Sequence, residues 1–283
     1  MGGTKLVKDC GWFVTGTDTG VGKTYVTALL LAALRQTGAD AVPMKPVQTG
    51  CARRNGGLVA PDLETALAAA GLKPAPREKR WMCPARFRTP CSPHLAAARE
   101  GGRIRVRDLV AAYRHLAARH ASVVVEGAGG VMVPLNTHET MLDLMRALRL
   151  PVILVARAGL GTINHTLLSL AALRAAEIPL AGVVLNTTQR GESASLVTSN
   201  RATIERLGKV KVLAVLPWRA APDVASMQKD ALFTRMAENF RHAEKSGRSR
   251  AVRSRRRDAA FQDCRAWNKH RAPQTPAECS CRR

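Results

Sequence analysis

The sequence predicts an α/β protein in which a doubly wound, mainly parallel sheet carries helices on both faces. Short apolar segments alternate along the chain with helical segments of about 10–15 residues, which is the pattern of repeated βαβ units. Several of the short segments are apolar at every position, as in VILVA at 152–156. Strands of this kind are expected where both faces of a parallel sheet are covered.

The alternation begins near the N-terminus. The segment GWFVT at 11–15 predicts a strand, and a glycine-rich turn joins it to an apolar helix. The segment AVPMK at 41–45 predicts the next strand. Residues 72–93 contain five prolines and little periodicity, so we expect a loop there. The helices predicted in this half lie at 23–36, 62–70, 95–100 and 106–120.

The same alternation continues through the second half. The predicted strands lie at 122–125, 152–156, 181–186 and 210–216. The predicted helices lie at 142–148, 164–176, 199–207 and 231–243. Beyond about residue 245 the sequence becomes rich in Arg and Ser and loses its hydrophobic pattern. We therefore predict one domain over residues 1–243 and a basic, disordered extension over 244–283.

The composition excludes several classes of protein. With 283 residues and 46% hydrophobic residues, the chain can bury a large core, which excludes disorder over its whole length and a small disulfide-dependent fold. No uncharged apolar run reaches 18 residues, and the N-terminus lacks the apolar core of a signal peptide. The seven cysteines include no C-x-x-C pair, so we expect free thiols in a cytoplasmic protein and no cysteine metal centre.

The formal net charge of +23 is densest in the C-terminal extension. A basic stretch is typical of a solvated tail, and also of a surface that binds nucleic acid or another anionic surface. We favour the solvated tail and expect nucleic acid to bind at most non-specifically through it.

The glycine-rich turn at 16–24 reads GTDTGVGKT, follows a strand and opens a helix. This is the setting of a phosphate-binding loop, although Thr17 stands where the strict pattern has its first glycine. Successive backbone N–H groups at a helix N-terminus form a nest for anions. Lys23 supplies a positive charge to the outer phosphates, and the Thr24 hydroxyl is a suitable oxygen ligand for Mg²⁺. The motif predicts binding of a nucleoside triphosphate rather than an ordinary glycine-rich turn.

Three charged residues are expected near this loop. Glu126 ends a buried strand just before GAGG, and Asp62 begins a helix; either carboxylate suits Mg²⁺. Asp62 is equally typical of a helix N-cap. Lys45 ends a strand and would steady an anionic substrate or a developing negative charge, although a surface lysine is the alternative.

Six sequence blocks occur in a fixed order. They are GTDTGVGKT at 16–24, KPVQTG at 45–50, CSPHLAAA at 91–98, VVVEGAGGVMVPL at 123–135, LPVILVARAGLGTINHTLLSL at 150–170 and AGVVLN at 181–186. Together they resemble the dethiobiotin synthetases, over roughly residues 10–240. The resemblance implies a P-loop α/β fold that works as a homodimer. It implies the ATP- and Mg²⁺-dependent reaction of 7,8-diaminononanoate with CO₂ to form a cyclic urea, through a carbamate and a carbamic–phosphoric anhydride.

The resemblance also implies roles for single residues. Lys45 and Lys23 would be catalytic, and Thr24, Asp62 and Glu126 would hold Mg²⁺. Substrate contacts would come from Thr19, Thr49, Gly161 and Asn164, the last two at a helix N-terminus that meets the substrate carboxylate across the dimer. The residues that would contact ATP with its metal ion are Gly20, Val21, Gly22, Lys23, Thr24, Tyr25, Asp62, Glu126, Gly127, Ala128, Gly129, Asn186, Thr187, Leu216, Pro217 and Trp218. Taken alone, Asn186 also fits a turn after a strand, and Trp218 fits simple packing.

Two other functions are weighed against this one. A cobyrinic acid amidotransferase of the same group would need an added glutaminase domain, for which the chain has no room. A partition-type ATPase that binds DNA or another partner would suit the basic charge. Such proteins carry a second lysine early in the loop, where this sequence has Asp18.

Overall fold

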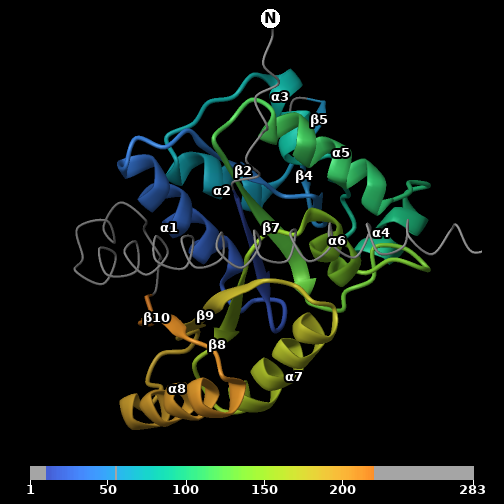
Figure 1. The fold of residues 1–283 in the computed structure, drawn as a ribbon. Coiled ribbons are helices and arrows are strands. Elements are labelled where there is room, and N and C mark those ends of the chain that lie inside the picture. Colours follow the sequence, from blue (N-terminus) through green and yellow to red (C-terminus); the bar gives the residue numbers. More distant parts are fainter. Residues whose placement is uncertain (1–10, 55, 220–283) are drawn as a thin grey trace, which may run out of the picture.

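The computed structural model describes residues 11–54 and 56–219, which form a three-layer α/β arrangement around one central sheet (Figure 1). The sheet has six strands in the order β10-β9-β8-β1-β7-β2, and every neighbouring pair is parallel. The strands are β1 (Gly11–Gly16), β2 (Ala41–Met44), β7 (Ser122–Gly130), β8 (Val152–Arg157), β9 (Leu180–Asn186) and β10 (Val212–Leu216). The predicted fold class is confirmed.

Eight helices connect and cover these strands in the described part of the chain. They are α1 (Lys23–Gln36), α2 (Pro61–Ala69), α3 (Pro76–Met82), α4 (Pro93–Arg99), α5 (Val106–Ala117), α6 (Met141–Leu148), α7 (Thr162–Ala175) and α8 (Ala194–Gly208). Helix α6 begins with a capping box, in which Thr140 and Asp143 satisfy each other's backbone N–H groups. The helices predicted within the described residues are present, with ends shifted by a few residues.

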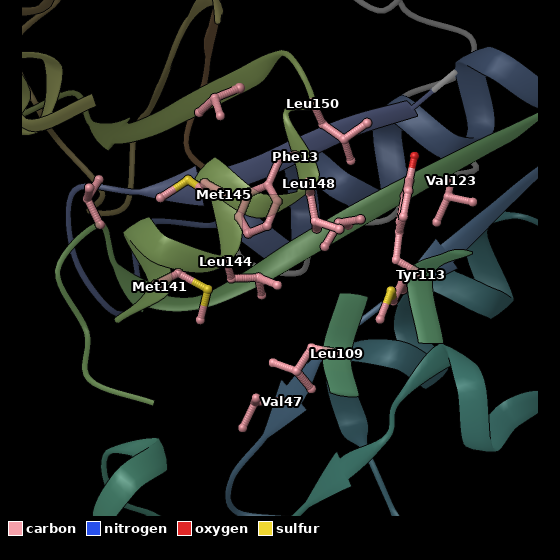
Figure 2. Close-up of a cluster of buried hydrophobic side chains, with 14 of the residues drawn as sticks. Phe13, Val47, Leu109, Tyr113, Val123, Met141, Leu144, Met145, Leu148 and Leu150 are labelled. Atoms are coloured by element: carbon pink, nitrogen blue, oxygen red, sulfur yellow. The ribbon is translucent and has the colours of Figure 1, made fainter. Parts of the chain in front are cut away.

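The core lies on both faces of the sheet because successive strand residues point to opposite sides. In β1, Trp12 and Val14 pack with α1, whereas Phe13 packs on the other face. Figure 2 shows Phe13 among side chains of α6, including Leu144 and Met145. This explains why the strands are apolar at nearly every position.

One prediction was wrong. Residues 72–93 are not a continuous loop, because they contain α3 and the short strand β6 (Ala85–Arg86). Proline is favoured at the first helical position, where its missing N–H costs nothing, and α3 and α4 both begin with a proline. Strand β6 pairs in parallel with β3 (Val47–Gln48), although β4, β5, α2 and α3 lie between them in the sequence. A second small sheet joins β4 (Ala52–Arg54) to β5 (Gly57–Val59).

The predicted helix at 231–243 and the proposed extension at 244–283 lie outside the described residues. Within the described part of the chain, no helix has the length and apolar character needed to cross a membrane.

Candidate active site

A cavity of about 700 Å³ opens at the carboxyl edge of the sheet, beside the glycine-rich loop. It is bounded by segments that follow β1, β2 and β7, as expected for a ligand site in an open parallel sheet. The predicted site residues that line it are Thr19, Gly20, Gly22, Lys23, Thr24, Lys45, Thr49, Asp62, Glu126, Ala128 and Gly129. Predicted residues from four separate stretches of sequence thus meet in one cavity.

The glycine-rich loop holds its shape through two glycines with left-handed backbone angles. Gly20 has φ 75° and Gly22 has φ 98°, values that L side chains rarely adopt. Gly22 is also closely packed, because a Cβ placed there would lie 2.2 Å from Nδ2 of Asn186. That same amide nitrogen donates a hydrogen bond to the carbonyl oxygen of Val21 at 3.0 Å. The end of β9 therefore supports the loop just where α1 begins.

Asp18 supports the other side of the loop. One carboxylate oxygen accepts the backbone N–H of Thr19 at 2.7 Å, and the other accepts a hydrogen bond from Arg157 at 3.2 Å. The carbonyl oxygen of Asp18 accepts a hydrogen bond from the Lys23 ammonium at 2.8 Å. Arg157 ends β8, where it is the register partner of Asn186. Two neighbouring strand ends thus fix the loop at two points.

Lys45 lies at the centre of a cluster of charged groups. Its ammonium nitrogen is 2.6 Å from an oxygen of Asp62 and 2.7 Å from an oxygen of Glu126. It also donates to the carbonyl oxygen of Gly127 at 3.2 Å. Lys45 is only 4% exposed and Glu126 only 2%. Burial opposes the charged form of Lys45, but the two carboxylates and their hydrogen bonds outweigh it and raise its pKa above the ordinary value.

Lys23 has the opposite balance. Burial is the largest effect, the nearby positive charge of Lys45 adds to it, and together they lower the pKa of Lys23 to about 8 despite the carboxylates of Glu126 and Asp62. The two lysines of the cavity therefore differ in the pH at which they lose charge.

Three oxygen-bearing side chains meet near Lys45. The Thr24 hydroxyl donates to the same Glu126 oxygen at 2.7 Å, and Asp62 reaches the cluster through Lys45. Asp62 stands one residue inside α2, after Ala60 at the N-cap and Pro61, so the N-cap alternative is wrong. Lys45 is buried, so the surface-lysine alternative is wrong as well.

The other predicted residues are not part of the lining of this cavity. Gly161, with φ 87°, is the N-cap of α7, and Asn164 follows in the first turn. The backbone N–H of Thr187 donates to the carbonyl oxygen of Leu216 at 2.9 Å, which joins the ends of β9 and β10. Trp218 follows β10, and the guanidinium of Arg190 lies 5.9 Å from the centre of its ring. The remaining predicted contacts outside the lining are Val21, Tyr25, Gly127, Asn186 and Pro217.

Some lining residues carried no assigned role in the sequence interpretation. Cys91, Ser92 and Pro93 belong to the block CSPHLAAA, which contributed to the resemblance and was the available signal for them. Gln48 also lines the cavity, between Lys45 and Thr49. The contact of Asp18 with Arg157 had no local signal, because 139 positions separate the two residues.

Comparison with known proteins decides the family. A protein named ATP-dependent dethiobiotin synthetase BioD from Anaeromyxobacter dehalogenans (strain 2CP-C) is 48% identical over 215 residues, covering 76% of this chain and 92% of the relative. A protein of the same name from Nitrosospira multiformis is 42% identical over 208 residues, covering 74% of this chain and 88% of the relative. The chain belongs to the dethiobiotin synthetase family. This membership confirms the resemblance carried by the six blocks and the prediction of an enzyme.

Two further comparisons agree with the dethiobiotin synthetase assignment at the level of the fold. A family model described as an AAA domain matches residues 11–225. The solved MinC:MinD cell division protein complex from Aquifex aeolicus contains a chain with a TM-score of 0.52 and 12% identity, covering 82% of this chain and 94% of that one. At such low identity this likeness supports the P-loop fold alone.

Proposed function

We propose that this protein uses ATP and Mg²⁺ to join CO₂ to 7,8-diaminononanoate and closes the cyclic urea of dethiobiotin. The observation that carries the proposal is the cluster of the buried Lys45 and Glu126 with the half-buried Asp62 and Thr24, which lines a cavity beside a phosphate-binding loop. The curated relatives are named for this ATP-dependent synthesis.

The loop would receive the triphosphate. Backbone N–H groups between Gly20 and Thr24 would bind the phosphates at the start of α1, where the helix dipole adds positive potential. Lys23 adds a full charge next to the outer phosphates. In phosphoryl transfer, positioning and charge neutralisation matter more than a protein nucleophile. Tyr25 follows the loop in α1, within the same nucleotide-binding stretch.

The donor set near Lys45 fits Mg²⁺. It contains one hydroxyl and two carboxylates, and both carboxylates contact the same ammonium nitrogen, so all three side chains belong to one cluster. Hard oxygen donors are those that Mg²⁺ prefers. Thr24, Asp62 and Glu126 would hold the ion, which supplies positive charge to the triphosphate oxygens when bound.

Lys45 would neutralise the carbamate formed when one substrate amine adds CO₂. The carbamate oxygen then takes the γ-phosphoryl group of ATP, which gives a carbamic–phosphoric anhydride and releases ADP. The second amine attacks the carbonyl carbon, the ring closes and phosphate leaves. Lys45 is suited to this because its raised pKa keeps it charged while negative charge moves between oxygens. Thr19 and Thr49 line the cavity and would orient the diamine or carbamate end.

The far end of the substrate would lie at the start of α7. Gly161 and Asn164 belong to this helix N-terminus, where a carboxylate is favoured by the dipole. Leu160 is 86% exposed and Leu168 is 63% exposed on the same segment. In a homodimer these exposed leucines would lie at the contact between the protomers. Each protomer would then cover the substrate that is bound at α7 of the other.

Adenine would lie at the ends of β9 and β10. Asn186 offers an amide there, and Trp218 offers an aromatic face next to the segment that contains Leu216, Pro217 and Thr187. Ala128 and Gly129 at the end of β7 line the cavity, and their small size would let the ligand approach the backbone closely.

The test is the dependence of ATP consumption on both co-substrates. Purified protein with Mg²⁺ should release phosphate only when diaminononanoate and bicarbonate are both present, and mass spectrometry should find dethiobiotin in equal amount. Equal phosphate release with and without the diamine would show a nucleotide hydrolase instead and would overturn the proposal.

A further inference from the structure

A second cleft, of about 510 Å³, lies between α3 and α5 and shares no lining residue with the cavity described above. Its volume is within the range of about 300–1,000 Å³ that is typical of small-molecule sites. Its lining residues are Ala75, Arg77, Glu78, Arg80, Trp81, His115 and Arg119.

The charge of the cleft is strongly unbalanced. Three guanidinium groups face one carboxylate, that of Glu78, and this carboxylate is already engaged at 3.0 Å by a ring nitrogen of His120. The other ring nitrogen of His120 lies 3.0 Å from a carboxylate oxygen of Asp40. Among the described residues, neither Arg77 nor Arg80 forms an ion pair. The cleft therefore presents positive charge that the described part of the chain does not neutralise.

Aromatic rings position one of the three guanidinium groups, that of Arg80. The rings of Trp81 and His115 stack with centroids 4.3 Å apart, and the Arg80 guanidinium lies 4.8 Å above the centroid of Trp81. Arg119 donates to the carbonyl oxygen of His115 at 2.9 Å. Stacking of guanidinium on an aromatic ring is favourable and restricts the arginine, so less entropy is lost when a ligand binds.

We propose that this cleft is a second ligand site, which binds a small multivalent anion through Arg77, Arg80 and Arg119. Guanidinium groups suit this role because each pairs with phosphate or carboxylate oxygens through two parallel hydrogen bonds. A ligand with several negative groups would engage more than one arginine at once. The site is independent of the proposed reaction, since neither its residues nor its ligand take part in it.

The pKa of His115 can report binding in this cleft, because His115 is part of its lining. Desolvation, together with the positive charges of Arg119 and Arg80, lowers its pKa, while Glu78 acts in the other direction. An anion bound between these arginines would offset their charge. Binding in the cleft should therefore raise the pKa of His115, whereas binding elsewhere should leave it unchanged.

The experiment titrates the full-length Lys23→Ala protein, in which the phosphate loop is weakened, with inorganic pyrophosphate or with citrate at fixed ionic strength and without Mg²⁺. Ring resonances of His115 are followed by NMR, assigned with His115→Gln. We expect saturable binding of at least one anion with a rise in the His115 pKa. The double substitution Arg77→Ala with Arg80→Ala should weaken binding about tenfold or more, which corresponds to roughly 1.4 kcal/mol.

The matched control removes two other exposed arginines, Arg99 and Arg103, by substitution with Ala, and should change the affinity less than twofold. Equal weakening in both double variants would mean that net charge alone attracts the anion, and would overturn the proposal. So would binding of neither anion, or binding that leaves His115 unchanged. Pyrophosphate and citrate distinguish a phosphate-bearing from a carboxylate-bearing ligand. No readout uses turnover, so failure here leaves the proposed function standing.

Discussion

At the scale of single residues, the two lysines of the cavity have different electrostatic environments and hence different tasks. Lys45 is tied to two carboxylates and stays charged, whereas Lys23 donates to a backbone carbonyl and has a pKa lowered to about 8. A group that stays charged can stabilise developing negative charge throughout a reaction. A group near its pKa responds to the arrival of the triphosphate.

Replacing Lys45 by Met should reduce turnover by about 100-fold or more, because a buried positive charge next to developing negative charge is lost. ATP affinity should change by no more than about threefold, since the loop residues remain. The free energy of unfolding should also fall, by up to about 5 kcal/mol, because Glu126 would stay buried without the Lys45 ammonium beside it. Steady-state rates, nucleotide titration and thermal unfolding measure the three effects.

Lys79 provides the matched control for that substitution. It also pairs with a carboxylate, that of Glu64 at 2.9 Å, but both groups are much more exposed. Lys79→Met should therefore leave turnover nearly unchanged and cost at most about 1 kcal/mol of stability. A Lys45→Met protein as active as Lys79→Met would exclude Lys45 from the chemistry.

The lowered pKa of Lys23 predicts a pH dependence. Lys23 carries its charge below about pH 8 and loses it as pH rises through that value. The kcat/KM for ATP, which reports the free enzyme, should therefore fall above about pH 8. At saturating ATP the fall should move to higher pH, because bound phosphates favour the charged lysine.

Lys23→Arg tests the assignment, since a guanidinium stays protonated throughout this range. Its kcat/KM is expected to be lower overall but without the fall near pH 8. If the fall persists unchanged in Lys23→Arg, another group causes it.

At the scale of elements, the phosphate loop depends on contacts from β8 and β9 that its own sequence does not contain. Asn186 holds Val21, and Arg157 holds Asp18. These contacts make Gly22 more sensitive than Gly20, although both have positive φ. A Cβ on Gly20 meets nothing within 4 Å, whereas one on Gly22 would lie 2.2 Å from Asn186.

The comparison of Gly22→Ala with Gly20→Ala uses this difference. Both variants pay the cost of a left-handed alanine, about 1–2 kcal/mol. Only Gly22→Ala must also displace Asn186, so it should weaken ATP binding about tenfold more than Gly20→Ala does. Nucleotide titration and thermal unfolding measure this. Equal effects of the two substitutions would show that the packing of Asn186 against the loop has no energetic role.

The elements also show how far the sequence could lead. The strands VVV and VILVA were predictable because burial on both faces leaves an unbroken apolar run. Helix α3 was missed because seven residues are too few to show periodicity, and the prolines in and around it are typical of a loop. The strand pair β3 and β6 depends on contacts distant in sequence, which no local pattern encodes.

The candidate site was predictable to a similar extent. The order of strand ends indicated that Lys45, Asp62 and Glu126 would gather at one edge, and they do. The sequence contained no sign that Lys45 would lie directly between the two carboxylates expected to bind metal. That arrangement follows from how α2 packs against the sheet, through contacts with α1 and β2.

At the scale of the whole molecule, two large apolar side chains of the segment that contains α7 are exposed to solvent. They are Leu160, just before the N-cap Gly161, and Leu168, in the middle of α7. In the proposed homodimer these two side chains would be buried between the protomers. Oligomeric state and substrate binding would then depend on the same surface.

The double substitution Leu160→Asp with Leu168→Asp should convert the proposed homodimer to monomers, because a carboxylate cannot be buried in an apolar contact without a large cost. Sedimentation velocity should show the loss of the dimer while circular dichroism stays unchanged. The KM for diaminononanoate should rise about tenfold or more, whereas the KM for ATP should change little, since the phosphate loop lies within one protomer. The control is Leu207→Asp, which alters a leucine of α8 that is 52% exposed. This variant should remain dimeric with an unchanged KM. Two results would contradict this prediction: a wild-type protein that sediments as a monomer at micromolar concentration, or a monomeric double variant with a normal KM for the diamine. Either result would mean that the α7 surface does not contribute to substrate binding across a dimer.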